Sequence, residues 1–147
     1  MKDYSEPRMH TAEHLLNQAM VRMFGCGRAF SSHIEKKKSK CDYRFPRDLT
    51  GEERAGLEQS VNAAVRADMP VRESFAAKET AAQKYDLKRL PEAAGENLRV
   101  ISIGDYDACP CIGPHVNSTA EIGAFRIIST GFENGVLRLR FRLETKP

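Results

Sequence analysis

The sequence predicts an α+β fold, a single domain in which a largely antiparallel sheet packs with two main helices. Two stretches carry apolar residues at the three- and four-residue spacing of a helix. Several shorter apolar stretches are bounded by turn residues, as in β-hairpins. Helices separated by hairpins lack the regular strand-helix alternation of a parallel sheet. One domain over residues 1–147 is therefore expected, a size at which single domains are common.

The first third of the chain predicts a helix followed by a hairpin. Residues 7–24 have helical apolar spacing, and Gly25 and Gly27 end the helix. Residues 29–45 contain two short strands around the charged stretch 35–40.

The second helix is expected to begin at Thr50, which has capping-box spacing with Glu53, and to run up to Pro70. Residues 71–75 follow as a strand and residues 76–85 as a short helix.

The last third predicts strands around a long loop. Residues 99–103 form a buried strand, and residues 104–123, rich in Gly, Pro, Asp and Asn, are expected to be mostly loop. Residues 124–129 and 136–143 flank the Asn-Gly turn at 134–135, a strong hairpin signal.

The composition is that of an ordinary globular protein, with 41% hydrophobic and 29% charged residues. No run approaches the roughly 18 apolar residues of a membrane span, and residues 1–8 have no apolar secretion core. A cytoplasmic protein away from membranes is expected. Its four cysteines are then better interpreted as thiols or metal ligands than as disulfides. The net charge of +3 is compatible with a polyanionic partner.

Two pairs of residues with the same spacing predict a metal site. His10 and His14 are four apart on the first expected helix, so both imidazoles project from one face and could bind one ion. Two surface or capping histidines are the alternative. Cys111 and His115 repeat the spacing in the Gly/Pro loop, and thiolate with imidazole is a ligand set that favours zinc.

Cys109 is an alternative ligand to Cys111. A buried small hydrophobe is the other interpretation of Cys111, but it leaves His115 unexplained. We favour a Zn²⁺ ion bound by His10, His14, Cys111 and His115.

Two segments resemble the paired signatures of aminoacyl-tRNA editing domains: RMHTAEHLL at residues 8–16 and CIGPHV at residues 111–116. The family is the second additional domain of alanyl- and threonyl-tRNA synthetases and of free-standing AlaX-type editing proteins. The resemblance implies a zinc-binding hydrolase of mischarged tRNA, with the four predicted ligands as its catalytic residues. Without a synthetase domain in these residues, a short free-standing editor acting in trans is expected.

The resemblance is mixed in its details. Residues 119–123, TAEIG, are of the alanyl type, whereas GPHV at residues 113–116 is of the threonyl type. Seryl-tRNA(Ala) is the expected substrate because an alanine site rejects serine by only about a hundredfold, so a second hydrolytic site is needed. Seryl-tRNA(Thr) is the alternative, and a non-catalytic zinc module that binds tRNA is the rival from another class. A metalloprotease is disfavoured because Glu13 adjoins the second histidine of the pair rather than the first.

The role of the metal is left open by the sequence. Three protein ligands would leave a position at which zinc activates water. Four ligands would limit it to orienting the substrate, with a histidine or Lys84 handling protons. By resemblance, Ser31 and Ser32 lie beside the site and could recognise a seryl hydroxyl; ordinary turn residues are the alternative.

The last expected strand alternates apolar side chains with Arg138, Arg140 and Arg142. One face therefore belongs to the core and the other carries three guanidinium groups, which could bind tRNA phosphates. The lysine-rich stretch 35–40 could add a second patch. A solvated face that discourages aggregation is the alternative.

Overall fold

The computed structural model describes residues 6–77 and 97–144, arranged as two helices and two antiparallel sheets. The α+β fold class is therefore confirmed, although the strands form two sheets rather than one. The expected helix at 76–85 and Lys84 lie mostly or entirely outside the described residues, and residues 76 and 77 belong to a strand.

Both helices form where the sequence predicts them. Helix α1 (Pro7–Phe24) begins with proline and ends at Gly25, whose left-handed φ of 66° suits a residue without Cβ. Helix α2 (Gly51–Arg66) is preceded by the capping box of Thr50 and Glu53, with reciprocal hydrogen bonds of 3.1 and 2.9 Å. None of the described helices is long and apolar enough to cross a membrane.

The larger sheet has the strand order β1-β2-β7-β6. Its strands are β1 (Ser31–His33), β2 (Ser39–Arg44), β6 (Ala124–Glu133) and β7 (Val136–Glu144). The turn between β6 and β7 holds Asn134 at φ 50° and Gly135 at φ 78°, the two positive angles of a type I′ hairpin turn. The two expected hairpins are therefore confirmed.

The smaller sheet has the order β3-β4-β5. Its strands are β3 (Val71–Ala77), β4 (Asn97–Ile103) and β5 (Asp107–Pro110). Strand β5 and the 3-10 helix η2 (Thr119–Ile122) lie in the region expected to be mostly loop. The sequence of β5, Asp-Ala-Cys-Pro, has no apolar alternation, and the strand exists because it pairs with the edge of β4.

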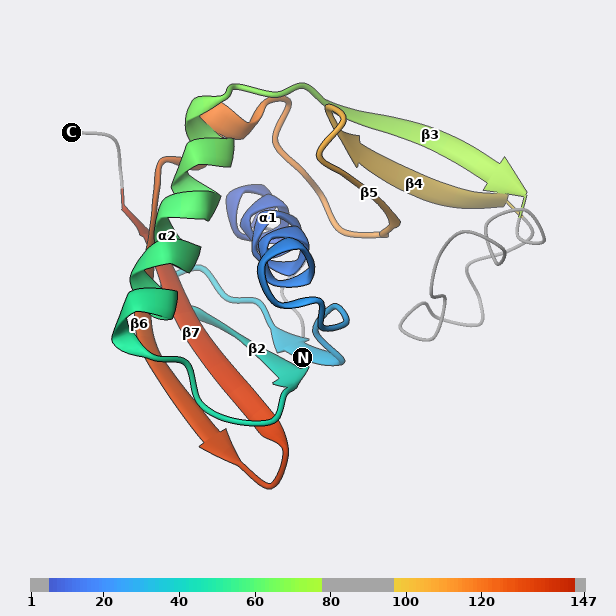
Figure 1. The fold of residues 1–147 in the computed structure, drawn as a ribbon. Coiled ribbons are helices and arrows are strands. Elements are labelled where there is room, and N and C mark those ends of the chain that lie inside the picture. The colour runs from blue at the N-terminus through green and yellow to red at the C-terminus, as the bar shows by residue number, and fades with distance from the viewer. Residues whose placement is uncertain (1–5, 78–96, 145–147) are drawn as a thin grey trace.

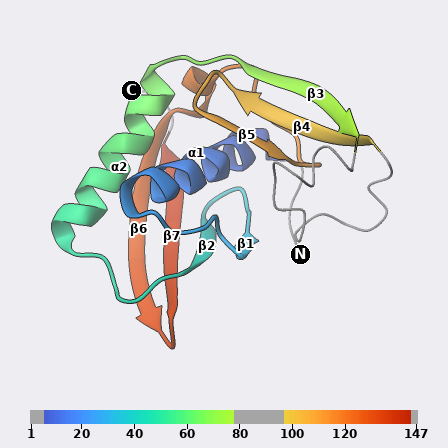
Figure 2. The same cartoon turned by 45° about the vertical axis from the view of Figure 1, so that its right-hand side comes forward.

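Helix α1 lies in the middle of the molecule, between the four-stranded sheet and the three-stranded sheet (Figures 1 and 2). Its apolar side chains meet those of α2 and the inner face of the larger sheet in one core. The largest fully buried members include Leu15, Leu16, Met20, Tyr43, Leu57, Phe125 and Phe141. This packing fixes α1 and brings β5 and its following loop against the helix.

Candidate metal centre

Three of the four predicted metal ligands meet in one cluster. Helix α1 presents His10 and His14 one turn apart, and both side chains are buried. The donor atoms of His14, Cys111 and His115 all lie within 4.8 Å of one another. Among these atoms, His115 Nε2 lies 3.4 Å from Cys111 Sγ.

His10 lies beside this cluster and is not part of the three-donor set. Its ring centre is 6.2 Å from that of His115, edge to face. The cysteine loop packs on it through Gly113, where a Cβ would lie 2.9 Å from His10 Nδ1. Because that distance is shorter than van der Waals contact allows, glycine is needed for the loop to close over His10.

A second set of donors shares His14. The Nδ1 atom of His14 lies 3.4 Å from Cys109 Sγ and 3.5 Å from a carboxylate oxygen of Asp107. These three donor atoms also lie within 4.8 Å of one another. Cys109, which the sequence offered as an alternative to Cys111, therefore does approach the site, together with an aspartate that the sequence analysis did not single out.

The second set of donors is in contact with the positively charged guanidinium of Arg28. Arg28 donates two hydrogen bonds to the Asp107 carboxylate, at 2.8 and 3.2 Å, and one to Cys109 Sγ at 3.4 Å. Gln18 donates another to Asp107 at 3.1 Å. A metal ion bound by this set would be repelled by the guanidinium. Asp107 is therefore better placed to orient the His14 ring, as carboxylates beside metal-binding histidines do.

The donors alter one another's protonation. Burial lowers the pKa of His14, but the neighbouring thiol and carboxylate groups raise it well above its usual value. Burial raises the pKa of Cys111, yet the hydrogen bond and charge of His14 lower it below its usual value. Burial and the positive charge of His14 lower the pKa of His115 to about 2. Cys111 and His115 are thus shifted toward the deprotonated forms that bind metals, whereas His14 has to lose its proton when it binds one. Two imidazole nitrogens and one thiolate are a donor set that fits zinc.

The His115 ring is oriented by Thr11, one residue after His10. Thr11 Oγ1 lies 2.9 Å from His115 Nδ1. The same hydroxyl donates to the carbonyl of Pro7 at 3.0 Å and accepts from the N–H of Val116 at 3.2 Å. Since its single proton is used, the remaining contact is satisfied by Nδ1–H donating to oxygen. This tautomer leaves the lone pair of Nε2 directed to Cys111.

The serine pair expected beside the site divides into two environments. Ser32 Oγ donates a 2.5 Å hydrogen bond to Glu13, the residue before His14, so it borders the cluster. Ser31 is exposed on the neighbouring position of β1.

The three arginines of β7 lie on the sheet face opposite the core, as their alternation predicts. Arg138 makes a two-pronged ion pair with Asp42, at 2.8 and 2.9 Å. Arg142 lies 3.1 Å from Glu144. Arg140 has no such acidic partner among the described residues.

Fold and donor cluster together define an α+β domain with a candidate metal centre at a helix face. Residues 98–139 match the model of the threonyl and alanyl tRNA synthetase second additional domain. These residues include Cys111 and His115 but not α1.

The relatives are alanine–tRNA ligases. That of Idiomarina loihiensis is 35% identical over 134 residues, which cover 90% of this chain and 16% of the ligase. Those of Gluconobacter oxydans and Halorubrum lacusprofundi are each 34% identical, over 88% and 90% of this chain and 16% and 15% of the ligase. The chain thus spans about a sixth of the length of these relatives. The matches confirm the resemblance to the second additional domain that the two signatures predicted.

Proposed function

We propose that the protein is an aminoacyl-tRNA deacylase that hydrolyses mischarged tRNA in trans at a zinc ion, with seryl-tRNA(Ala) as substrate. The observation that carries the proposal is the meeting of His14 with Cys111 and His115, which come from the two segments with the editing signature. His10, one turn away on the same helix, is the fourth ligand in this proposal.

The reaction is hydrolysis of the ester between an amino acid and the terminal ribose. When bound, zinc supplies polarisation of the ester carbonyl and a lowered pKa for water. Two neighbouring residues orient the ligand rings: Thr11 contacts His115, and Asp107 contacts His14. Orientation by such outer partners typically contributes tenfold to a hundredfold in metal affinity or activity.

Discrimination between serine and alanine requires a polar group at the site. The Ser32 hydroxyl and the Glu13 carboxylate border the cluster and could hydrogen-bond a seryl hydroxyl. Because Ser32 already donates to Glu13, a seryl hydroxyl would add a hydrogen bond to this pair that alanine cannot make, and a hydrogen bond to a charged group is worth about 1.5 to 3 kcal/mol. Glu13 is buried, which supports this role.

The proposal is tested by deacylation of seryl-tRNA(Ala), seryl-tRNA(Thr) and alanyl-tRNA(Ala) at equal concentration. We expect fastest hydrolysis of seryl-tRNA(Ala), and loss of that activity in Cys111→Ser but not in Cys26→Ser. Cys26 is a matched control because its thiol contacts the carbonyl of Met20, away from the cluster. Preference for seryl-tRNA(Thr) would change the substrate. No activity on any tRNA, with zinc bound, would support the non-catalytic zinc module.

Binding of tRNA by the sheet face that carries Arg138, Arg140 and Arg142 is the second part of the proposal, and guanidinium groups already paired with a carboxylate, as those of Arg138 and Arg142 are, should contribute least to it. Phosphate neutralisation by such side chains provides most sequence-independent affinity for nucleic acids. The row supports this role because its side chains lie on the face away from the core.

A further inference from the structure

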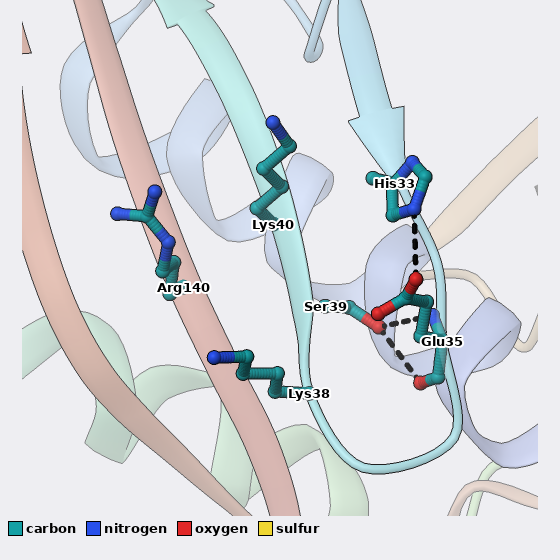
Figure 3. A pocket seen from close by; sticks show the side chains of 6 residues that line it. All are labelled: His33, Glu35, Lys38, Ser39, Lys40 and Arg140. Carbon is teal, nitrogen blue, oxygen red and sulfur yellow. Dashed lines mark hydrogen bonds and ion pairs between the residues drawn. The ribbon is translucent and has the colours of Figure 1, made fainter. Parts of the chain in front are cut away.

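The outer face of the four-stranded sheet carries a row of basic side chains that crosses three strands. In the register of the sheet, His33 of β1 is opposite Lys40 of β2, and Lys40 is opposite Arg140 of β7. Lys38 stands just before β2 in the connecting turn. Figure 3 shows these side chains together on the side of the sheet away from the helices.

This row is unfavourable for the sheet itself. Like charges directly opposite each other on neighbouring strands are destabilising. Elsewhere on the same face a carboxylate accompanies each arginine: Arg138 lies opposite Asp42 and pairs with it. Arg142 lies opposite Arg126, but both pair with Glu144. By contrast, in the described part of the chain neither Lys40 nor Arg140 forms an ion pair. An anion from outside the molecule would remove this repulsion.

The row borders a pocket of about 60 Å³, lined by His33, Glu35, Lys38, Ser39, Lys40 and Arg140 (Figure 3). A cavity needs about 10 to 15 Å³ to hold one water molecule, so this pocket is large enough for a group of phosphate size. The one carboxylate in it, that of Glu35, is held by His33 Nε2 at 2.9 Å. The Ser39 hydroxyl accepts a hydrogen bond from the backbone N–H of Glu35 and donates one to its carbonyl, and these two bonds fix the turn.

The same hairpin is in contact with the helix that carries the metal donors. Ser39 Oγ lies 3.5 Å from the sulfur of Met9, next to His10. Ser32 Oγ contacts Glu13, next to His14. An RNA backbone bound on the β1–β2 hairpin would therefore lie on the element that packs against helix α1 beside the candidate metal centre.

We propose that Lys38, Lys40 and Arg140 form a phosphate-binding site for the tRNA backbone, and that Arg138 and Arg142 contribute little to it. That the partner is RNA rests on the proposed function. Of the three arginines of β7, only Arg140 belongs to this site, together with two lysines from the neighbouring hairpin.

The test measures binding of an acceptor-stem RNA hairpin that carries no amino acid, by fluorescence anisotropy at several salt concentrations. We expect Arg140→Gln and Lys40→Gln each to weaken binding by about tenfold and to reduce the salt slope by about one. Arg142→Gln is the matched control, since it removes the same charge from the same strand, and it should change affinity by less than about twofold. Lys38→Gln, in an exposed turn, tests the site without risk to the fold.

Equal losses in Arg140→Gln and Arg142→Gln would overturn the inference, because they would indicate a diffuse basic face. Unchanged RNA binding in Lys38→Gln, Lys40→Gln and Arg140→Gln would also overturn it. Because this RNA carries no amino acid, there is no ester to hydrolyse, and the result does not depend on deacylase activity. A protein that binds RNA through this row but deacylates nothing would contradict only the proposed function.

Discussion

The donor cluster and the outer face of the larger sheet handle charge in opposite ways. In the cluster the buried Asp107 carboxylate meets Arg28 and His14, so opposite charges meet in the interior. On the outer face Lys40 and Arg140 lie opposite each other, and within residues 6–77 and 97–144 neither forms an ion pair. The protein's own residues neutralise the charges of the first arrangement, whereas for the second we propose a phosphate group as the counter-charge.

The difference also predicts which kind of experiment is sensitive to each region. Breaking a buried pair leaves an uncompensated charge and is strongly destabilising, whereas exposed pairs contribute about 0 to 1 kcal/mol. Variants in the cluster should therefore change metal affinity and stability. Variants on the outer face should change RNA binding and leave the fold nearly unaffected.

The largest effect is expected for the thiol that joins the two histidines. Cys111→Ser should lower zinc affinity by more than about a hundredfold, since the loss of a ligand exceeds the tenfold to hundredfold typical of outer partners. Cys109→Ser, whose sulfur faces Arg28, should lower it by less than about tenfold. Chelator competition measures both. The reverse order would place the ion in the set of His14, Asp107 and Cys109.

The next effect concerns stability and its dependence on pH. Burial raises the pKa of Asp107, but the hydrogen bonds and charges of His14 and Arg28 lower it to about 2. A carboxyl with a lowered folded-state pKa stabilises the fold above its unfolded pKa of 3.8, and this contribution disappears as the pH falls through about 2. Asp107→Asn should therefore cost roughly 2 kcal/mol at pH 7.

Urea denaturation with a chelator present measures this cost without a contribution from metal binding. The difference between wild type and Asp107→Asn should be constant between about pH 5 and pH 6.5 and shrink between about pH 4 and pH 2 as Asp107 is protonated. It should also shrink at higher pH, because Asp107 contributes to the raised pKa of His14. Asp105→Asn makes the same change at an exposed position two residues away and should be nearly neutral. A pH-independent difference would mean that ionisation of Asp107 does not stabilise the fold.

The sequence was a good guide to elements with local signals. The capping box at Thr50, the left-handed end of α1 at Gly25 and the Asn-Gly turn each depend on residues within one turn of chain. Strand β5 has no such signal, because it exists through pairing with β4. Its alternate residues Asp107 and Cys109, with Cys111 directly after its end, were the available clue, since side chains two apart share a strand face.

The candidate site was predictable to a similar extent. Helical spacing places His10 and His14 on one face, but spacing cannot tell which of them joins the donor set of Cys111 and His115. That depends on Gly113, which packs on His10, and on Asp107, which contacts His14 and is itself held by Arg28. The alternation of β7 likewise predicts a shared face for its arginines, whereas only the register with β2 separates Arg140 from Arg138.

The smallest effect distinguishes those two arginines by stability alone. Arg138→Gln removes an ion pair with Asp42 and should cost about 0.2 to 1 kcal/mol, a range that already includes solvent screening. Arg140→Gln removes a charge opposite Lys40 and should be neutral or slightly stabilising. Thermal unfolding at low and high salt measures both, and the difference should narrow at high salt because exposed charges are screened. If Arg140→Gln destabilised the protein as much as Arg138→Gln, the charge at position 140 would have a structural partner, and the argument that it awaits a phosphate would fail.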